Sequence, residues 1–147
     1  MVFISATRLR VKSIFFLPSF MIANYSSAKQ LIKTEGFLSG RELIDKKLTF
    51  WTLTIWKSDA NMKEFRNSVP HRKAMQKLPS WCDEATYIHW TQEENQLPEW
   101  KTVFGKMISE GRISKVRNPS SNHLSKNFQE IKWTVFESNF KSALRTK

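Results

Sequence analysis

Leu48-Thr49-Phe50-Trp51-Thr52-Leu53-Thr54-Ile55-Trp56 is the most strand-like stretch of the chain. Aromatic and β-branched residues fill it, and such residues are favoured on the pleated surface of a sheet. Successive side chains of a strand point to opposite faces, so Trp51, Leu53 and Ile55 share one face while Phe50 and Trp56 share the other. We therefore predict a strand with large apolar groups on both faces, each of which needs a cover.

The segments on either side of this strand complete a regular pattern. Residues 37–44 and the polar turn Asp45-Lys46-Lys47 precede it, and together they predict a hairpin. Ser58 or Asp59 can cap a following helix through a side-chain oxygen. Pro70 fits the first turn of a second helical piece over residues 70–78, and a strand-like segment follows at residues 85–90.

The N-terminal and C-terminal flanks add three further elements. Residues 1–9 alternate as a strand does, and residues 14–34 carry apolar side chains at near-helical spacing, with an irregularity expected at Pro18. Pro98 opens another helix that Gly111 closes. The order of the first six elements predicts an α+β fold, a ferredoxin-like βαββαβ arrangement with a four-stranded antiparallel sheet, followed by an extra C-terminal helix.

The length and the charge distribution predict one domain with a basic extension. The chain has 147 residues, enough for one domain at 1–111, and a formal net charge of +11. Residues 112–127 are rich in Ser, Asn and Lys and favour a linker or an extended arm, while residues 128–144 regain apolar side chains that can dock on the domain or on a second subunit. The extension is therefore placed at 112–147.

Two absences bear on the cellular location. Cys82 is the single cysteine, so the chain cannot form an internal disulfide, and this favours a reducing compartment such as the cytoplasm. The most apolar run, residues 14–23, is about half the ~20 residues needed to cross a bilayer. We expect no membrane span and no cleaved leader.

Several segments resemble a known superfamily. Residues 48–75, with the strand end Thr54-Ile55-Trp56-Lys57-Ser58, resemble the dimeric α+β-barrel superfamily of antibiotic-biosynthesis and haem-degrading monooxygenases. His71-Arg72-Lys73-Ala74-Met75, Trp81-Cys82-Asp83-Glu84-Ala85 and His89-Trp90-Thr91 are more closely similar to an uncharacterised bacterial family related to the spheroidene monooxygenase group. The resemblance covers residues 1–117. It implies a homodimer in which the second sheet face pairs with that of the partner.

The resemblance also implies a ligand pocket, for which we predict four lining residues: Thr7, Trp51, Phe65 and Met75. In the haem-degrading members, an Asn on the first strand, a Trp on the helix after the third strand and an axial His surround the cofactor. The matching positions here hold Thr7, Phe65 and Met75, so that chemistry does not carry over directly. His71 lies one helical turn before Met75 and remains a candidate axial ligand.

His71 and His89 are the candidate catalytic residues. Thr7, Thr52, Thr54 and His89 are the polar side chains expected to project from the sheet, and among them His89 can act as a base near neutral pH. The competing interpretation gives both histidines structural roles, with His71 at a helix start and His89 hydrogen-bonded beside Trp90. The three histidines share no metal-ligand spacing, so a dedicated metal site is not expected.

We interpret the sequence as a monooxygenase-like protein that binds a hydrophobic or aromatic small molecule between sheet and helices. The cofactor is left open between haem and none. The first alternative is a non-catalytic binding protein or structural homodimer of the same fold. The second is nucleic-acid binding through the basic extension, with Phe128 and Trp133 stacking on bases, which ranks last because the sheet lacks an RNA-recognition motif.

Overall fold

A single antiparallel sheet organises the molecule. The computed structural model describes residues 1–131 and 134–144, and six strands within them pair in the order β5-β4-β1-β3-β2-β6. The strands are β1 (Val2–Val11), β2 (Phe37–Asp45), β3 (Thr49–Trp56), β4 (Cys82–Gln92), β5 (Arg112–Ile113) and β6 (Thr134–Lys141). The inner strands β4-β1-β3-β2 form the predicted βαββαβ unit, so the α+β, ferredoxin-like fold is confirmed.

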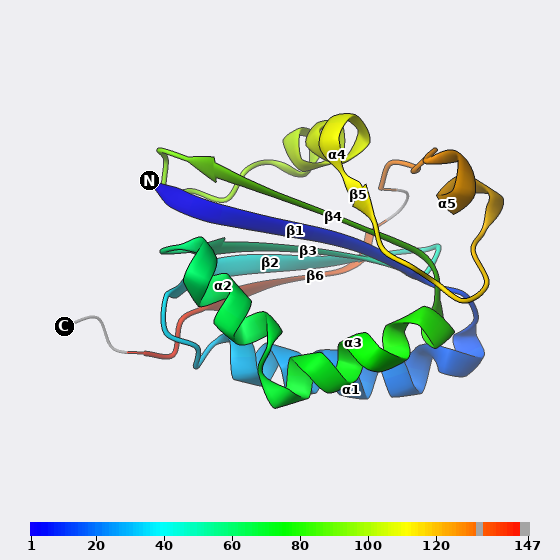
Figure 1. Cartoon of the computed structure of the whole chain (residues 1–147), viewed down its shortest axis with the longest axis horizontal. Helices are drawn as coiled ribbons and strands as arrows, with labels where there is room; N and C mark the ends of the chain where they lie inside the picture. Colours follow the sequence, from blue (N-terminus) through cyan, green and yellow to red (C-terminus); the bar gives the residue numbers. More distant parts are fainter. Residues whose placement is uncertain (132–133, 145–147) are drawn as a thin grey trace.

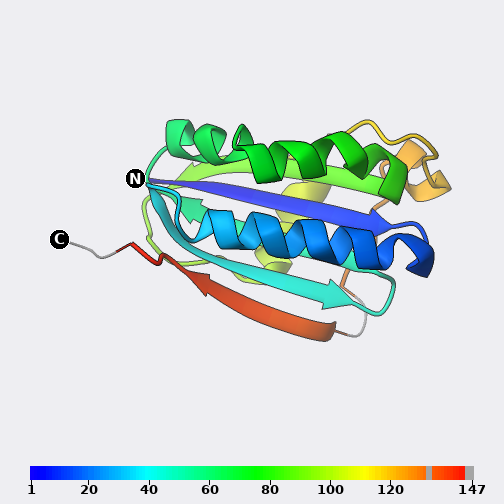
Figure 2. The ribbon, with the colours of Figure 1, turned by 90° about the horizontal axis from the view of Figure 1, so that it is seen from below.

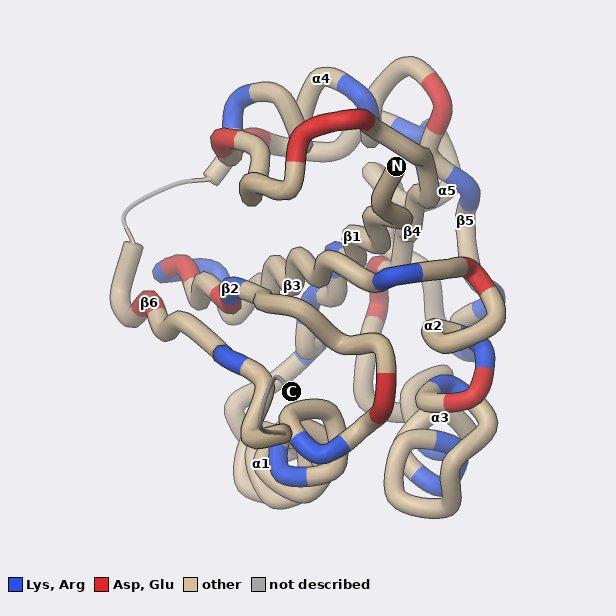
Figure 3. The backbone as a smooth tube through the Cα atoms, turned by 90° about the vertical axis from the view of Figure 1, so that its left-hand side faces the viewer, with Lys and Arg blue, Asp and Glu red and all other residues tan. Residues whose placement is uncertain are grey.

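Helices cover both faces of the sheet (Figure 1). On one face lie α1 (Leu17–Leu31), α2 (Asp59–Arg66) and α3 (Val69–Trp81), and α1 and α3 run side by side, roughly along the direction of the strands (Figure 2). On the other lie α4 (Trp100–Glu110) and the short α5 (Ser121–Ser125), as the view along the sheet shows (Figure 3). The fold therefore has three layers, with the sheet in the middle.

The ends of the helices follow local chemistry. The Ser58 hydroxyl accepts a hydrogen bond from the Asn61 N–H and caps α2, as predicted. Pro18 lies in the first turn of α1, which begins at Leu17 after a short 3-10 turn at Ile14–Phe16. The helix predicted from residue 14 therefore starts at residue 17, and the irregularity expected at Pro18 lies at its beginning. The predicted end of α3 at residue 78 is also wrong, because the helix passes Pro79 and meets β4 directly after Trp81.

The second face of β3 is covered by the chain itself. Trp51, Leu53 and Ile55 are fully buried together with Val103 and Met107 of α4. The expectation that a second subunit must cover this face is therefore wrong, since α4 already does so. A homodimer remains a prediction that this structure does not test.

Much of the predicted basic extension packs on the domain. Residues 112–127, predicted as a linker or an extended arm, contain β5 and α5, and Val116 and His123 within them are buried. β6 pairs along β2 and adds the outermost strand on that side. Trp133 and residues 145–147 lie outside the described residues. Within the described part of the chain, no helix is both long and apolar enough to cross a membrane.

Candidate ligand pocket

A cavity of about 350 Å³ lies between the sheet and helices α1, α2 and α3. Two cross-strand rows of side chains form its floor, because the antiparallel register aligns alternate positions of β2, β1, β3 and β4. The first row runs Glu42, Thr52, Thr7 and Tyr87, and the second runs Thr54, Ser5 and His89. The floor is therefore rich in hydroxyl groups.

The roof of the cavity differs sharply in chemistry from the floor. It is formed by side chains of α1, α2 and α3, most of them apolar: Phe20, Ala23, Ala28, Leu31, Met62, Phe65, Ala74, Met75 and Leu78. Trp56 and Trp81 close the two ends, since Trp56 packs with Phe65 and Trp81 packs with Phe20. A cavity with an apolar wall and a few convergent polar groups is typical of a small-molecule site.

His71 lies at the edge of this cavity, on the first turn of α3. Its ring packs against Phe65 with centroids 4.7 Å apart, and its Nδ1 lies 3.2 Å from the carbonyl oxygen of Arg66. A proton on Nδ1 would be donated to that carbonyl, which leaves Nε2 as an acceptor. Burial lowers the pKa of His71, and the charge of Arg66 lowers it further although the backbone hydrogen bond opposes both. The ring is therefore neutral at neutral pH.

His89 projects from β4 into the same cavity. Its ring lies between those of Phe3 and Tyr87, at 5.3 and 5.4 Å. Burial lowers the pKa of His89, and the positive charge of Arg66 adds to this effect. His89 is therefore a second neutral imidazole that can accept a proton from a bound molecule.

The structure brings five of the six predicted site residues together and excludes the sixth. Thr7, Phe65, His71, Met75 and His89 all line the cavity. Trp51 lies on the opposite face of the sheet, fully buried beside Trp100 and Phe104 of α4. The placement of Trp51 in the pocket is corrected, because strand alternation sends positions 52, 54 and 56 to the cavity and position 51 away from it.

Glu42 is a pocket residue that the sequence analysis missed. Glu42 is 5% exposed, and its carboxylate accepts hydrogen bonds from Asn24 Nδ2 at 2.8 Å and from Thr52 Oγ1 at 3.3 Å. Burial raises the pKa of Glu42 above its ordinary value, although both hydrogen bonds oppose the shift. The sequence contained one indication of this role, because Glu42 is a charged residue of a predicted strand and is followed by the apolar residues Leu43 and Ile44.

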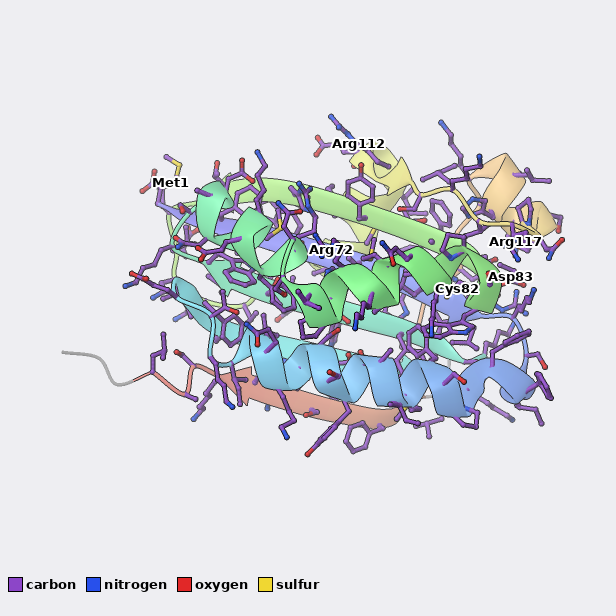
Figure 4. All side chains as sticks on the ribbon, turned by 60° about the horizontal axis from the view of Figure 1, so that its bottom comes forward. Met1, Arg72, Cys82, Asp83, Arg112 and Arg117 are labelled. Atoms are coloured by element: carbon purple, nitrogen blue, oxygen red, sulfur yellow. The ribbon has the colours of Figure 1, made fainter. Side chains whose placement is uncertain are left out.

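Other reactive side chains lie outside the cavity. Cys82 is fully buried at the start of β4 (Figure 4), and burial raises its pKa to about 12, so the thiol is a poor nucleophile. His123 is buried, and its Nδ1 accepts a hydrogen bond from the Ala85 N–H. Over residues 1–131 and 134–144, no three His, Cys, Asp or Glu side chains gather in a way that could hold a metal ion.

The cavity does not fit haem well. A tetrapyrrole is a broad flat macrocycle with two carboxylates, whereas about 350 Å³ is near the lower end of the ~300–1,000 Å³ that small-molecule sites span. The His71 ring packs on Phe65, and its Nδ1 lies against the Arg66 carbonyl, so only Nε2 would be available to an iron atom. The size of the cavity suits a molecule of a few fused rings.

Comparison with known proteins gives a fold and no closer assignment. No protein-family model matches the sequence, and no curated protein matches it. Solved structures do match: SnoaB, a cofactor-independent oxygenase from Streptomyces nogalater, has 15% sequence identity and a TM-score of 0.52, covering 67% of this chain and 98% of its own. A provisionally assigned antibiotic biosynthesis monooxygenase from Nitrosomonas europaea has 11% identity and a TM-score of 0.56, with coverage of 65% and 93%.

A conserved protein from Methanosarcina mazei is similar at 14% identity and a TM-score of 0.56, covering 63% of this chain and 94% of its own.

The chain thus has the ferredoxin-like α+β fold of the antibiotic biosynthesis monooxygenase-like proteins. These neighbours are matched over nearly their whole length, and about a third of this chain lies outside the shared part. The fold that the resemblance implies is therefore confirmed. The closer similarity to the spheroidene monooxygenase group stays a prediction.

Proposed function

We propose that the protein binds a hydrophobic or aromatic small molecule in the cavity beneath α1–α3 and oxygenates it without a cofactor. The observation that carries this proposal is the cavity itself, with its apolar roof, its hydroxyl-rich floor and two neutral histidines on one side. An electron-rich aromatic ring would fit between floor and roof, and His89 or His71 would accept a proton from it. Dioxygen would be the oxidant: one oxygen atom would enter the product as a carbonyl oxygen, and the other would leave as water with the two hydrogens that the substrate loses. The names of the structural neighbours support an oxygenase over other reactions.

A binding protein without catalysis is the second candidate. It shares the cavity and needs no proton acceptor, so the two candidates differ in the role of the histidines. Oxygen uptake by the purified protein in the presence of naphthol, measured with an oxygen electrode, separates them. Uptake that falls at least about ten-fold in His89→Ala or in His71→Ala, with ligand affinity retained, would support catalysis, whereas unchanged uptake in both would contradict it.

Filling the cavity should abolish ligand binding. Ala74 lies on α3 and lines the roof. In Ala74→Phe the larger ring would occupy the ligand's space, and we expect the affinity for naphthol in a calorimetric titration to fall at least about ten-fold. Ala60→Phe, at an exposed position of α2, adds the same ring outside the cavity and should leave the affinity unchanged. Equal affinities for the two variants would contradict the proposed site.

We further propose a cytoplasmic homodimer that forms through the outer edge of β6. Val135 and Phe136 on this strand are 69% and 55% exposed, and an exposed apolar edge strand is a ready surface for pairing with a second copy. Light scattering should give about twice the 17.3 kDa of one chain, and Phe136→Glu should reduce the mass to that of a monomer. Tyr25→Glu, on the outer surface of α1, is the control. A monomeric mass for the native protein would exclude this dimer.

Nucleic-acid binding through the basic extension gains no support. Phe128, one of the two aromatic residues considered for base stacking, is 5% exposed and packs near the Arg8 guanidinium. A buried ring cannot stack on a base. Trp133, the other residue, lies outside the described part of the chain. Arg112 and Arg117 lie at the periphery of the molecule (Figure 4), where they contribute to its net positive charge.

A further inference from the structure

Glu42 is the buried carboxyl group among the described residues that line the pocket, which also carries hydroxyl groups, two imidazoles and one guanidinium, from Arg66. It sits on β2 at one end of the first floor row, next to Thr52 and opposite Asn24 of α1. Within the described residues, no Lys or Arg nitrogen comes within 4.0 Å of its carboxylate. Among the described residues, its hydrogen-bond donors are therefore two neutral groups, from Asn24 and Thr52.

The carboxylate has unused capacity to accept hydrogen bonds. Its two oxygens offer about four acceptor sites, of which Asn24 and Thr52 occupy one on each oxygen. Ser27, one helical turn after Asn24, also lines the cavity, and its Oγ is buried without a partner among residues 1–131 and 134–144. Two polar groups that line the same cavity thus have unsatisfied hydrogen-bonding capacity.

This arrangement costs stability, which argues against a purely structural role. Removing a carboxylate from water without a cation is unfavourable, and the raised pKa of Glu42 reflects that cost. A Gln at this position would keep the shape and one acceptor oxygen at a lower cost. Residues that break local rules of stability in this way cluster at functional sites.

We propose that Glu42 determines ligand specificity by accepting a hydrogen bond from a hydroxyl group on the aromatic ligand, with the Ser27 hydroxyl as a second polar group lining the same cavity. The inference rests on the proposed function and adds the class of ligand: an aromatic molecule with a hydroxyl group near one edge. The net charge of +11 disfavours a cationic ligand, so a neutral donor is the better match.

Calorimetric titration with naphthol and with its methyl ether tests the proposal. The two probes share the ring system, but the ether lacks a hydrogen-bond donor. We expect the native protein to prefer naphthol at least about ten-fold, as a hydrogen bond to a charged acceptor implies. Glu42→Gln should lose this preference while its affinity for the ether stays unchanged, and its thermal midpoint should stay equal or rise. Glu64→Gln, an exposed change of the same chemistry on α2, should behave as the native protein.

Each of the other possible results would contradict a specific part of the proposal. If both probes bind but Glu42→Gln keeps the preference for naphthol, the role of Glu42 is wrong and the proposed pocket stands. If Glu42→Gln weakens both probes equally and lowers the thermal midpoint, Glu42 is structural. If neither probe binds the native protein, the proposed pocket is refuted, and the inference about Glu42 is refuted with it.

Discussion

Replacement of Arg8 by Met is expected to lower the free energy of unfolding by about 3–5 kcal/mol, because it leaves a buried carboxylate without its partner. Arg8 Nη1 and Glu84 Oε2 are 2.8 Å apart, and the two side chains are 4% and 1% exposed. The guanidinium also lies between the rings of Trp51 and Phe128, at 5.4 and 5.6 Å. Thermal unfolding should show a loss of about 10 °C or more.

Arg10→Met provides the matched control. Arg10 Nη1 lies 3.7 Å from Glu84 and 3.8 Å from Asp83, and its side chain is 35% exposed. Since solvent screens this longer contact, we expect a loss below about 1 kcal/mol. A similar loss in both variants would show that net charge, and not the buried pair, controls the stability.

The acid dependence of stability gives a second measure of the same pair. Burial raises the pKa of Glu84, but hydrogen bonds from Arg8 and Ser120 and the nearby positive charges outweigh it and hold the pKa below its ordinary 4.5. A carboxyl with a lowered pKa contributes stability above its unfolded pKa, and the contribution disappears as the pH falls through the folded pKa. The difference between the native protein and Arg8→Met should therefore shrink below about pH 4.5.

Met107→Ala should be nearly as damaging, at about 2–5 kcal/mol, because a large buried side chain is lost from the layer between α4 and the sheet. Met107 is fully buried with Val103 and Trp51. Met75→Ala, where the side chain is 42% exposed, should cost less than about 1 kcal/mol. Chemical denaturation of both variants makes the comparison. Equal small losses would show that α4 is not the cover on which this face depends.

Local patterns predicted the inner part of the fold, and long-range contacts decided the rest. The alternation in residues 48–56, the cap at Ser58 and the proline in the first turn of α3 depend on neighbours in sequence, so β3, α2 and α3 were predictable. β6 was not, because its exposed residues alternate weakly and its order comes from pairing with β2, far away along the chain. Pro79 was expected to lie beyond the end of a helix, but α3 continues through it to Trp81. The carbonyl of Pro79 accepts a hydrogen bond from the N–H of Arg117, a contact between distant parts of the chain that the local sequence does not show.

The same distinction applies to the pocket. Thr7, Thr52, Thr54 and His89 were expected to project together from the sheet, and all four line the cavity, because strand alternation alone decides the face. The contact between Glu42 and Asn24 depends on how α1 docks on β2, which no local pattern records. Trp51 was misplaced because both faces of β3 carry aromatic rings and the sequence does not say which face is hollow.

The cavity has a hydroxyl-rich floor and a mostly apolar roof, so the two faces of a planar ligand bound between them would meet different surroundings. A planar ring held there would show one side to the threonines of β1 and β3 and the other to the aromatic and aliphatic side chains of α1–α3. Polar substituents at its rim would fix the orientation by reaching the floor. A reaction that creates a stereocentre on such a ring would then proceed from one side, and its product would have a single handedness.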